Sequence, residues 1–110
     1  MLNRERTFMW VAAMAVLSAC SSVRMQRADE AYDLMQYPKA ERLYEKALAQ
    51  AEHRGARARL ADAYRKHNAW EHSLAQYRQL YAAHPLTGDT ALHYGEVLLA
   101  SGEHDEASDQ

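Results

Sequence analysis

Residues 60–77 read LADAYRKHNAWEHSLAQY, and this stretch decides the fold. Small and apolar residues recur at helical spacing on both sides of a short polar turn that precedes Trp70. After the turn, Trp70 is followed by Ser73 at +3, by Tyr77 at +7 and by Leu80 at +10. This spacing places the side chains on one face of a helix, so the stretch predicts two helices joined by a tight turn.

The same arrangement recurs along the chain. Tyr37, Ala40 and Tyr44 precede Trp70, Ser73 and Tyr77 by 33 residues each. A third copy opens at Gly102-Glu103-His104-Asp105-Glu106-Ala107, where His104 follows Trp70 by 34 residues. The segments in front of the second and third copies also align, with Leu60-x3-Tyr64 matched by Tyr94-x3-Leu98. Self-similarity at such a period is typical of helical repeat proteins.

The pattern predicts helices at roughly 24–35, 38–52, 55–67, 70–83, 89–101 and from 103 onward. Pro38 suits a first helical turn, and Pro85 suits a helix end. Leu86-Thr87-Gly88-Asp89 is expected to form a turn between repeats, with Asp89 as the N-cap. The composition agrees with helices, because only four Gly and two Pro occur among 110 residues.

The N-terminal segment has a different character. Phe8 through Leu17 are ten apolar residues behind Arg4 and Arg6. A helix of ten residues spans about 15 Å, half of a bilayer core, but it has the length of the apolar region of a signal peptide. A buried core helix is the alternative, and the absence of any polar face argues against it.

Leu17-Ser18-Ala19-Cys20 follows directly and resembles the lipobox of bacterial lipoproteins. The resemblance implies that residues 1–19 are cleaved, that Cys20 is acylated, and that residues 20–23 form a short tether. Ser21 after the cysteine implies the outer membrane. Two or more acyl chains would anchor the protein stably. An ordinary buried thiol is the alternative for Cys20, the only cysteine, which can form no internal disulfide.

The motifs Leu60-Ala61-x2-Tyr64 and Ser73-x3-Tyr77, closed by Pro85, resemble the tetratricopeptide repeat. The resemblance implies an all-α solenoid of antiparallel hairpins with repeats at about 21–53, 54–87 and 88–110. The last hairpin is incomplete, with its turn at Gly102. Either the chain is truncated, which we favour, or a partner covers that end, since repeats need a closing element. The residues expected to be left partly uncovered are Leu92, Val97, Leu98 and Leu99.

In this family the inner helices line a concave groove. By register, the groove residues would be Asp29, Tyr32 and Asp33 in the first copy, Asp62, Arg65 and Lys66 in the second, and Leu92, Glu96 and Leu99 in the third. Mixed charges beside an aromatic ring suit an extended or helical peptide. A solvated helix face is the alternative for each of these residues.

These features favour an outer-membrane lipoprotein, facing the periplasm, that acts as a scaffold in assembly of an envelope machine for secretion, pilus formation, gliding or outer-membrane biogenesis. The 60–66 stretch with Trp70 and Tyr77 is also similar to repeats in the front part of OmpA-like envelope lipoproteins. The expected partner is a protein or peptide, with the membrane reached through lipid. The net charge of −2 gives no sign of a nucleic-acid partner.

Catalysis, a cofactor and a metal are not expected, because the chain has no nucleophile motif, phosphate loop or H-E-x-x-H. The rival hypothesis is a ligand- or metal-sensing lipoprotein that uses histidines at helix ends. No two histidines are spaced i, i+3 or i, i+4, which favours solvated or capping side chains. The six are His53, His67, His72, His84, His93 and His104.

Overall fold

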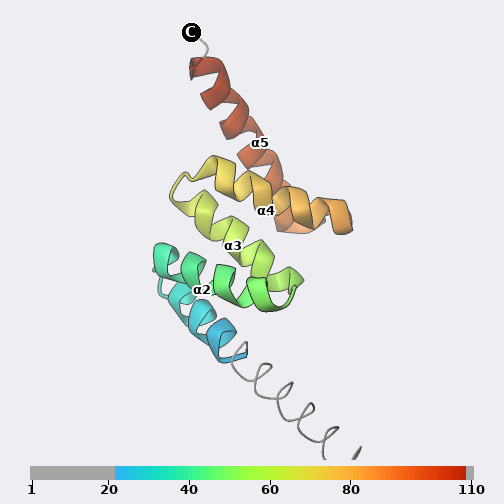
Figure 1. Ribbon diagram of the computed structural model, residues 1–110. Helices are drawn as coiled ribbons and strands as arrows, with labels where there is room; N and C mark the ends of the chain where they lie inside the picture. The colour runs from blue at the N-terminus through green and yellow to red at the C-terminus, as the bar shows by residue number, and fades with distance from the viewer. Residues whose placement is uncertain (1–21, 109–110) are drawn as a thin grey trace, which may run out of the picture.

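The computed structural model describes the backbone of residues 22–108 and the side chains of residues 22–102. A helix over residues 22–33 comes first, followed by α2 (Tyr37–Gln50), α3 (Arg54–Lys66), α4 (Trp70–Ala83) and α5 (Gly88–Ser108) (Figure 1). No strand occurs between residues 22 and 108, so the all-α expectation is confirmed. The expected signal peptide and Cys20 lie outside the described residues. Within that same part of the chain, no helix is long and apolar enough to span a bilayer.

Successive helices lie against one another and are joined by short turns, so that the elements follow each other in order along the molecule (Figure 1). The third helix is central, because α3 packs against α2 and α4 and also contacts α5. Two apolar clusters result. The first joins the 22–33 helix, α2 and α3 through Ala28, Ala31, Ala40, Tyr44, Ala56, Leu60 and Tyr64. The second joins α3, α4 and α5 through Ala61, Leu74, Tyr77, Leu80 and Val97.

The turns after the 22–33 helix and after α3 have the same geometry. Each contains one residue with positive φ, Met35 at 59° and Asn68 at 66°, which stand 33 positions apart. Each turn closes with the hydrogen-bond pair of a Schellman motif, in which one amide reaches back five residues and the preceding amide three. The bonds are Gln36 N to Ala31 O and Met35 N to Tyr32 O, and Ala69 N to Tyr64 O and Asn68 N to Arg65 O. The sequence period is therefore also a period of backbone structure.

Small residues let the paired helices approach closely. Ser73 on α4 and Ala61 on α3 are both fully buried, and the Ser73 hydroxyl donates a 2.7 Å hydrogen bond to the Ala61 carbonyl. Ala40, one period before Ser73, is also fully buried. Tyr44 and Tyr77 fill the space beside these contacts and are 0% and 1% exposed. The small and aromatic positions of the repeat therefore have separate packing roles.

The prediction of a turn at Gly102 is wrong. α5 continues through Gly102 to Ser108 as one helix. Each residue added to an existing helix gains a backbone hydrogen bond, whereas a new helix must first pay for a costly nucleus. Glycine also remains tolerable inside a helix, at a cost of about 1 kcal/mol relative to alanine.

Two smaller expectations for α5 also change. Asp89 lies inside the first turn, after Gly88 at φ 60°, and is not the N-cap, although its charge still favours the positive end of the helix dipole. Leu92, Leu98 and Leu99 are exposed, at 61%, 42% and 71%, as expected, but Val97 is fully buried. Val97 lies on the opposite face of α5, where the second cluster covers it.

Candidate functional site

Three carboxylates occupy equivalent positions in successive repeats and lie on three different helices. They are Asp29 on the 22–33 helix, Asp62 on α3 and Glu96 on α5, separated by 33 and 34 residues. Each forms an ion pair or hydrogen bond that reaches another helix. Together with their partners Tyr32, Arg59, Arg65 and His93, we call this set the carboxylate ladder. It is the candidate site.

Asp29 is the first step of the ladder. It accepts hydrogen bonds from the Tyr44 hydroxyl on α2 and from Arg59 Nη1 on α3, both at 2.5 Å. Burial, and then the hydrogen bond to the Asp29 carboxylate, raise the pKa of Tyr44 well above its ordinary value. The Tyr44 phenol therefore stays a donor. Arg59 is half exposed, at 51% of its side chain, so its guanidinium remains open to a ligand.

Asp62 is the central step and is the most buried of the three, with 12% of its side chain exposed. It accepts hydrogen bonds from Arg65 Nη2 at 2.7 Å and from the Tyr32 hydroxyl on the 22–33 helix. Burial acts to raise the pKa of the Asp62 carboxyl. The Tyr32 hydrogen bond and the Arg65 charge outweigh burial and hold that pKa below its usual range. Asp62 is therefore a carboxylate at neutral pH.

Arg65 links the second step to the third. Its Nη1 lies 3.2 Å from Glu96 Oε2, while Nη2 holds Asp62, so one guanidinium joins α3 to α5. His93 Nδ1 lies 3.7 Å from Asp62 Oδ1, the oxygen that also accepts from Arg65. Glu96 has 49% of its side chain exposed and is the outermost acid of the ladder.

A hollow of about 180 Å³ lies beside Asp62, where the 22–33 helix, α3, α4 and α5 meet. Its polar walls carry both charges, with Arg59 and His93 facing the acids. The lining residues are Tyr32, Ala58, Arg59, Asp62, Tyr77, Asp89, Thr90 and His93. Burial, followed by the charge of Asp62, raises the pKa of the Tyr77 hydroxyl to about 12. The hollow can therefore accept a short polar side chain or a peptide group, but it has no activated nucleophile.

The structure brings together five of the nine groove residues expected from the sequence. The five in the ladder are Asp29, Tyr32, Asp62, Arg65 and Glu96. Asp33, Leu92 and Leu99 are exposed and stand outside these contacts, and Lys66 acts only through its charge, which lowers the pKa of Asp62.

Sequence reasoning missed Arg59, His93, Tyr44 and Tyr77. A recognisable signal was available, because Arg59 and His93 are themselves one period apart. Each pairs with the acid 30 or 31 residues before it, Arg59 with Asp29 and His93 with Asp62. A search for opposite charges just short of one repeat length would have found both.

Four of the histidines lie at or near helix ends. His53 Nδ1 accepts a 3.0 Å hydrogen bond from Ala56 N and caps α3, while His67 ends α3 and pairs with Glu41. His84 is the C-cap of α4, and His72 lies beside the Tyr64 ring at 5.1 Å. Within the part of the chain that is described, no three His, Cys, Asp or Glu side chains form a group that could hold a metal. The metal-sensing hypothesis therefore gains no support.

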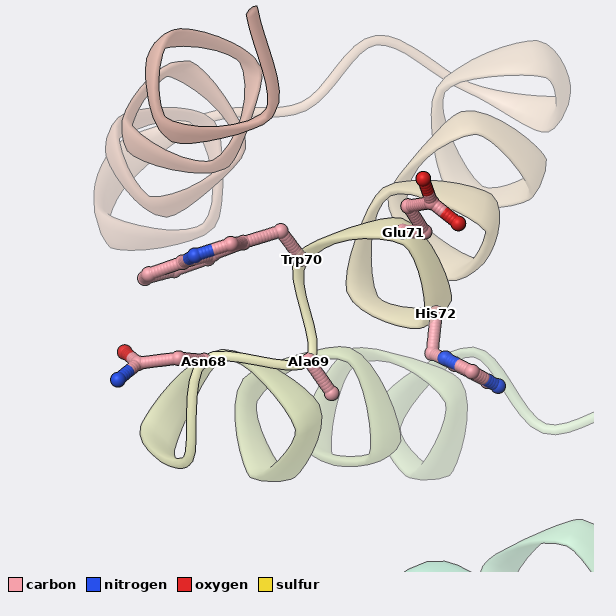
Figure 2. Close-up of a pocket in the computed structure, with 5 residues that line it drawn as sticks. All are labelled: Asn68, Ala69, Trp70, Glu71 and His72. Carbon is pink, nitrogen blue, oxygen red and sulfur yellow. The ribbon is translucent and has the colours of Figure 1, made fainter. Parts of the chain in front are cut away.

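A larger hollow of about 380 Å³ lies at the turn between α3 and α4, lined by Asn68, Ala69, Trp70, Glu71 and His72 (Figure 2). The Trp70 and Asn68 side chains extend from the turn in the same direction, while His72 points the opposite way. Trp70 packs against the second cluster, which accounts for its position without a ligand. Polar groups that diverge in this way do not form a binding site, so the ladder remains the candidate.

A scan against protein-family models finds no match to this chain, and a search of curated proteins finds none either.

Proposed function

We propose that the chain is an outer-membrane lipoprotein of the tetratricopeptide-repeat type, anchored through Cys20. Its repeats serve as a scaffold for a protein partner in assembly of an envelope machine, whether for secretion, pilus formation, gliding or outer-membrane biogenesis. The lipid anchor rests on the Leu17-Ser18-Ala19-Cys20 motif. The repeat type is supported by the two equivalent turns at Met35 and Asn68.

The observation that carries the scaffold function is the carboxylate ladder. It forms a continuous charged surface over the 22–33 helix, α3 and α5, in which Arg59 and Glu96 remain half exposed. Exposed charges of both signs at fixed spacing suit a peptide that carries opposite charges in matching order. The deeper members Asp62 and Arg65 hold the helices together and so present this surface rigidly.

The anchor is tested by the intact mass of the membrane-extracted protein. We expect a chain that starts at Cys20 and carries acyl chains, and a Cys20→Ser variant that stays at the unprocessed mass. A wild-type chain at the unprocessed mass would contradict the anchor. The scaffold function is tested separately, by the partner experiment.

The partner experiment compares two exposed lysines. Lys66→Glu changes the charge beside Asp62 on α3, whereas Lys46→Glu makes the same change on α2, which contributes no carboxylate to the ladder. Arg65 is unsuitable, since reversing its charge would leave the buried Asp62 unpaired. We expect proteins captured by crosslinking and affinity purification with wild type to be retained by Lys46→Glu and lost by Lys66→Glu, at equal helical circular dichroism. Equal capture by both variants would show that the positive charge beside Asp62, at this end of α3, is not part of the partner surface.

A further inference from the structure

Helix α5 is apolar on two opposite sides. Val97 on one side is fully buried against α4 and α3. Leu92 and Leu99 on the other side are 61% and 71% exposed, and Leu98 is 42% exposed. Exposed apolar area costs about 25 cal/mol per Å², so a helix face that carries three exposed leucines is stabilised when another surface covers it. The outer side of α5 is therefore a candidate for such a contact.

The exposed face is centred on Gly95. At 100° per residue, Ala91, Leu92, Leu98 and Leu99 all lie within about 60° of Gly95 around the helix axis. A Cβ added at Gly95 would meet no atom within 4 Å, so another backbone can approach closely here. Figure 1 shows the C-terminal half of α5 extending beyond the other helices, which leaves room for a second body.

Residues 103–108, which continue α5, do not supply this cover. The residues that follow Gly102 along α5 are Glu103-His104-Asp105-Glu106-Ala107-Ser108, of which only Ala107 is apolar. Folding such a segment back over Leu92 and Leu99 would place charged groups on an apolar surface. The occupant must itself present an apolar face with small residues at its centre.

The face of α5 has that composition and is symmetric about Gly95. Leu92 and Leu98 stand three residues before and after it, Ala91 and Leu99 four, and the two glycines at positions 88 and 102 seven. We infer that this face binds the same face of a second copy of the chain, with the two α5 helices antiparallel and a two-fold axis at Gly95. In this arrangement each residue before Gly95 faces the residue at the same distance after Gly95 in the other copy. Leucine then lies opposite leucine, alanine opposite leucine, and glycine opposite glycine. Self-complementarity of this kind is what a two-fold contact requires.

The charges around the face are compatible with this pairing. The helical positions of residues 88–102 place no charged side chain within about 60° of Gly95 in either direction around the axis. Glu96 lies at its edge, and the two-fold axis brings the Glu96 edges of both copies to the same side. The ion pair between Glu96 and Arg65, at 3.2 Å, offsets that like-charge contact. This dimer goes beyond the proposed scaffold function and does not depend on it.

Single cysteines in the full chain test the geometry, in a Cys20→Ser background that leaves one thiol. A contact of one helix from each copy is small, so oxidative cross-linking, which traps transient pairs, is the suitable readout. The Gly95→Cys thiols meet on the axis, and we expect a covalent dimer. The Leu92→Cys thiols would stand about 9 Å apart along the helix. Since a disulfide needs Cα atoms within about 7 Å, this variant should stay monomeric.

A pair of charge variants then tests the surface. Leu99→Glu should reduce the Gly95→Cys dimer at least tenfold. Leu34→Glu, at a side chain of matched 68% exposure at the other end of the molecule, should leave the dimer unchanged. Absence of the Gly95→Cys dimer would overturn the inference and leave the face open to a different protein. Equal cross-linking of the Gly95→Cys and Leu92→Cys variants would overturn the antiparallel arrangement, and an unaffected Leu99→Glu variant would exclude this face.

Discussion

Asp62 shows how one buried charge can be stabilising in a small protein. Removing a carboxylate from water is costly, and the cost is recovered only if the carboxylate receives good hydrogen bonds. Asp62 receives them from Tyr32 on one helix and from Arg65 on its own helix, with His93 near by on α5. The Tyr32 hydrogen bond therefore both satisfies the charge and joins two helices, and Arg65 extends the contact to Glu96 on a third.

The first prediction concerns this carboxylate. Asp62→Asn should lower the free energy of unfolding at pH 7 by about 1–3 kcal/mol, because Arg65 loses its buried partner. Asp33→Asn, the same change at an exposed position, should alter it by less than about 0.5 kcal/mol. Urea unfolding of the three proteins measures both differences.

The pH dependence of the Asp62→Asn effect follows from the direction of the pKa shift. The folded protein holds the pKa of Asp62 below its unfolded value of about 3.9. The stabilisation is therefore complete above that value and is lost as the pH falls through the folded pKa. The difference between wild type and Asp62→Asn should shrink below about pH 4. A difference that stayed constant down to pH 2 would show that Asp62 does not act as a carboxylate.

Among the helices, α5 departs furthest from the repeat pattern. Positions 35 and 68 adopt positive φ and end their helices, and Gly102 stands at the corresponding place in the third copy. Glycine adopts such a conformation more easily than methionine or asparagine. Nevertheless α5 continues through Gly102 to Ser108. Local preference at a glycine does not by itself end a helix.

The second prediction uses two glycines of α5. Gly102→Ala should raise the stability of dilute protein by about 1 kcal/mol, since alanine is the better helix former and a Cβ there meets nothing within 4 Å. Gly88→Ala should lower it by about 1 kcal/mol, because Gly88 has φ +60°. Thermal unfolding followed by circular dichroism measures both. Destabilisation by Gly102→Ala would indicate a turn at Gly102 in place of the continuous helix.

The whole molecule is a row of helices in which each contacts mainly its neighbours. The two clusters meet only along α3, whose Leu60 belongs to the first and Ala61 to the second. Stability in such an array is close to a sum of local interfaces, so one end can loosen while the other stays folded.

The third prediction follows from this arrangement. Val97→Ala removes two buried methyl groups from the second cluster and should cost about 2 kcal/mol. Hydrogen exchange should accelerate in α5 and remain nearly unchanged in α2. Leu34→Ala, at an exposed position outside α5 and outside the second cluster, should change neither the stability by more than about 0.5 kcal/mol nor the exchange in α5. Uniform acceleration over all helices would show that the molecule unfolds as a single cooperative unit.

The sequence alone was enough for the helical class, for the period and for most helix ends. The period depends on small and aromatic residues whose packing roles are local, such as Ser73 against Ala61 and Tyr77 beside it. It was also enough to identify five ladder residues, because equivalent positions in a repeat face the same side.

Only the tertiary structure could decide the rest. The continuation of α5 through Gly102 is a feature of the packed structure, and Val97 is buried because α4 covers that side of α5. Arg59 and His93 join the ladder because helices about thirty residues apart in the sequence bring them beside Asp29 and Asp62. These outcomes depend on contacts between distant residues, which no local preference contains. The period of a pattern can be read from the chain, whereas the partners of a side chain exist only once the helices are packed.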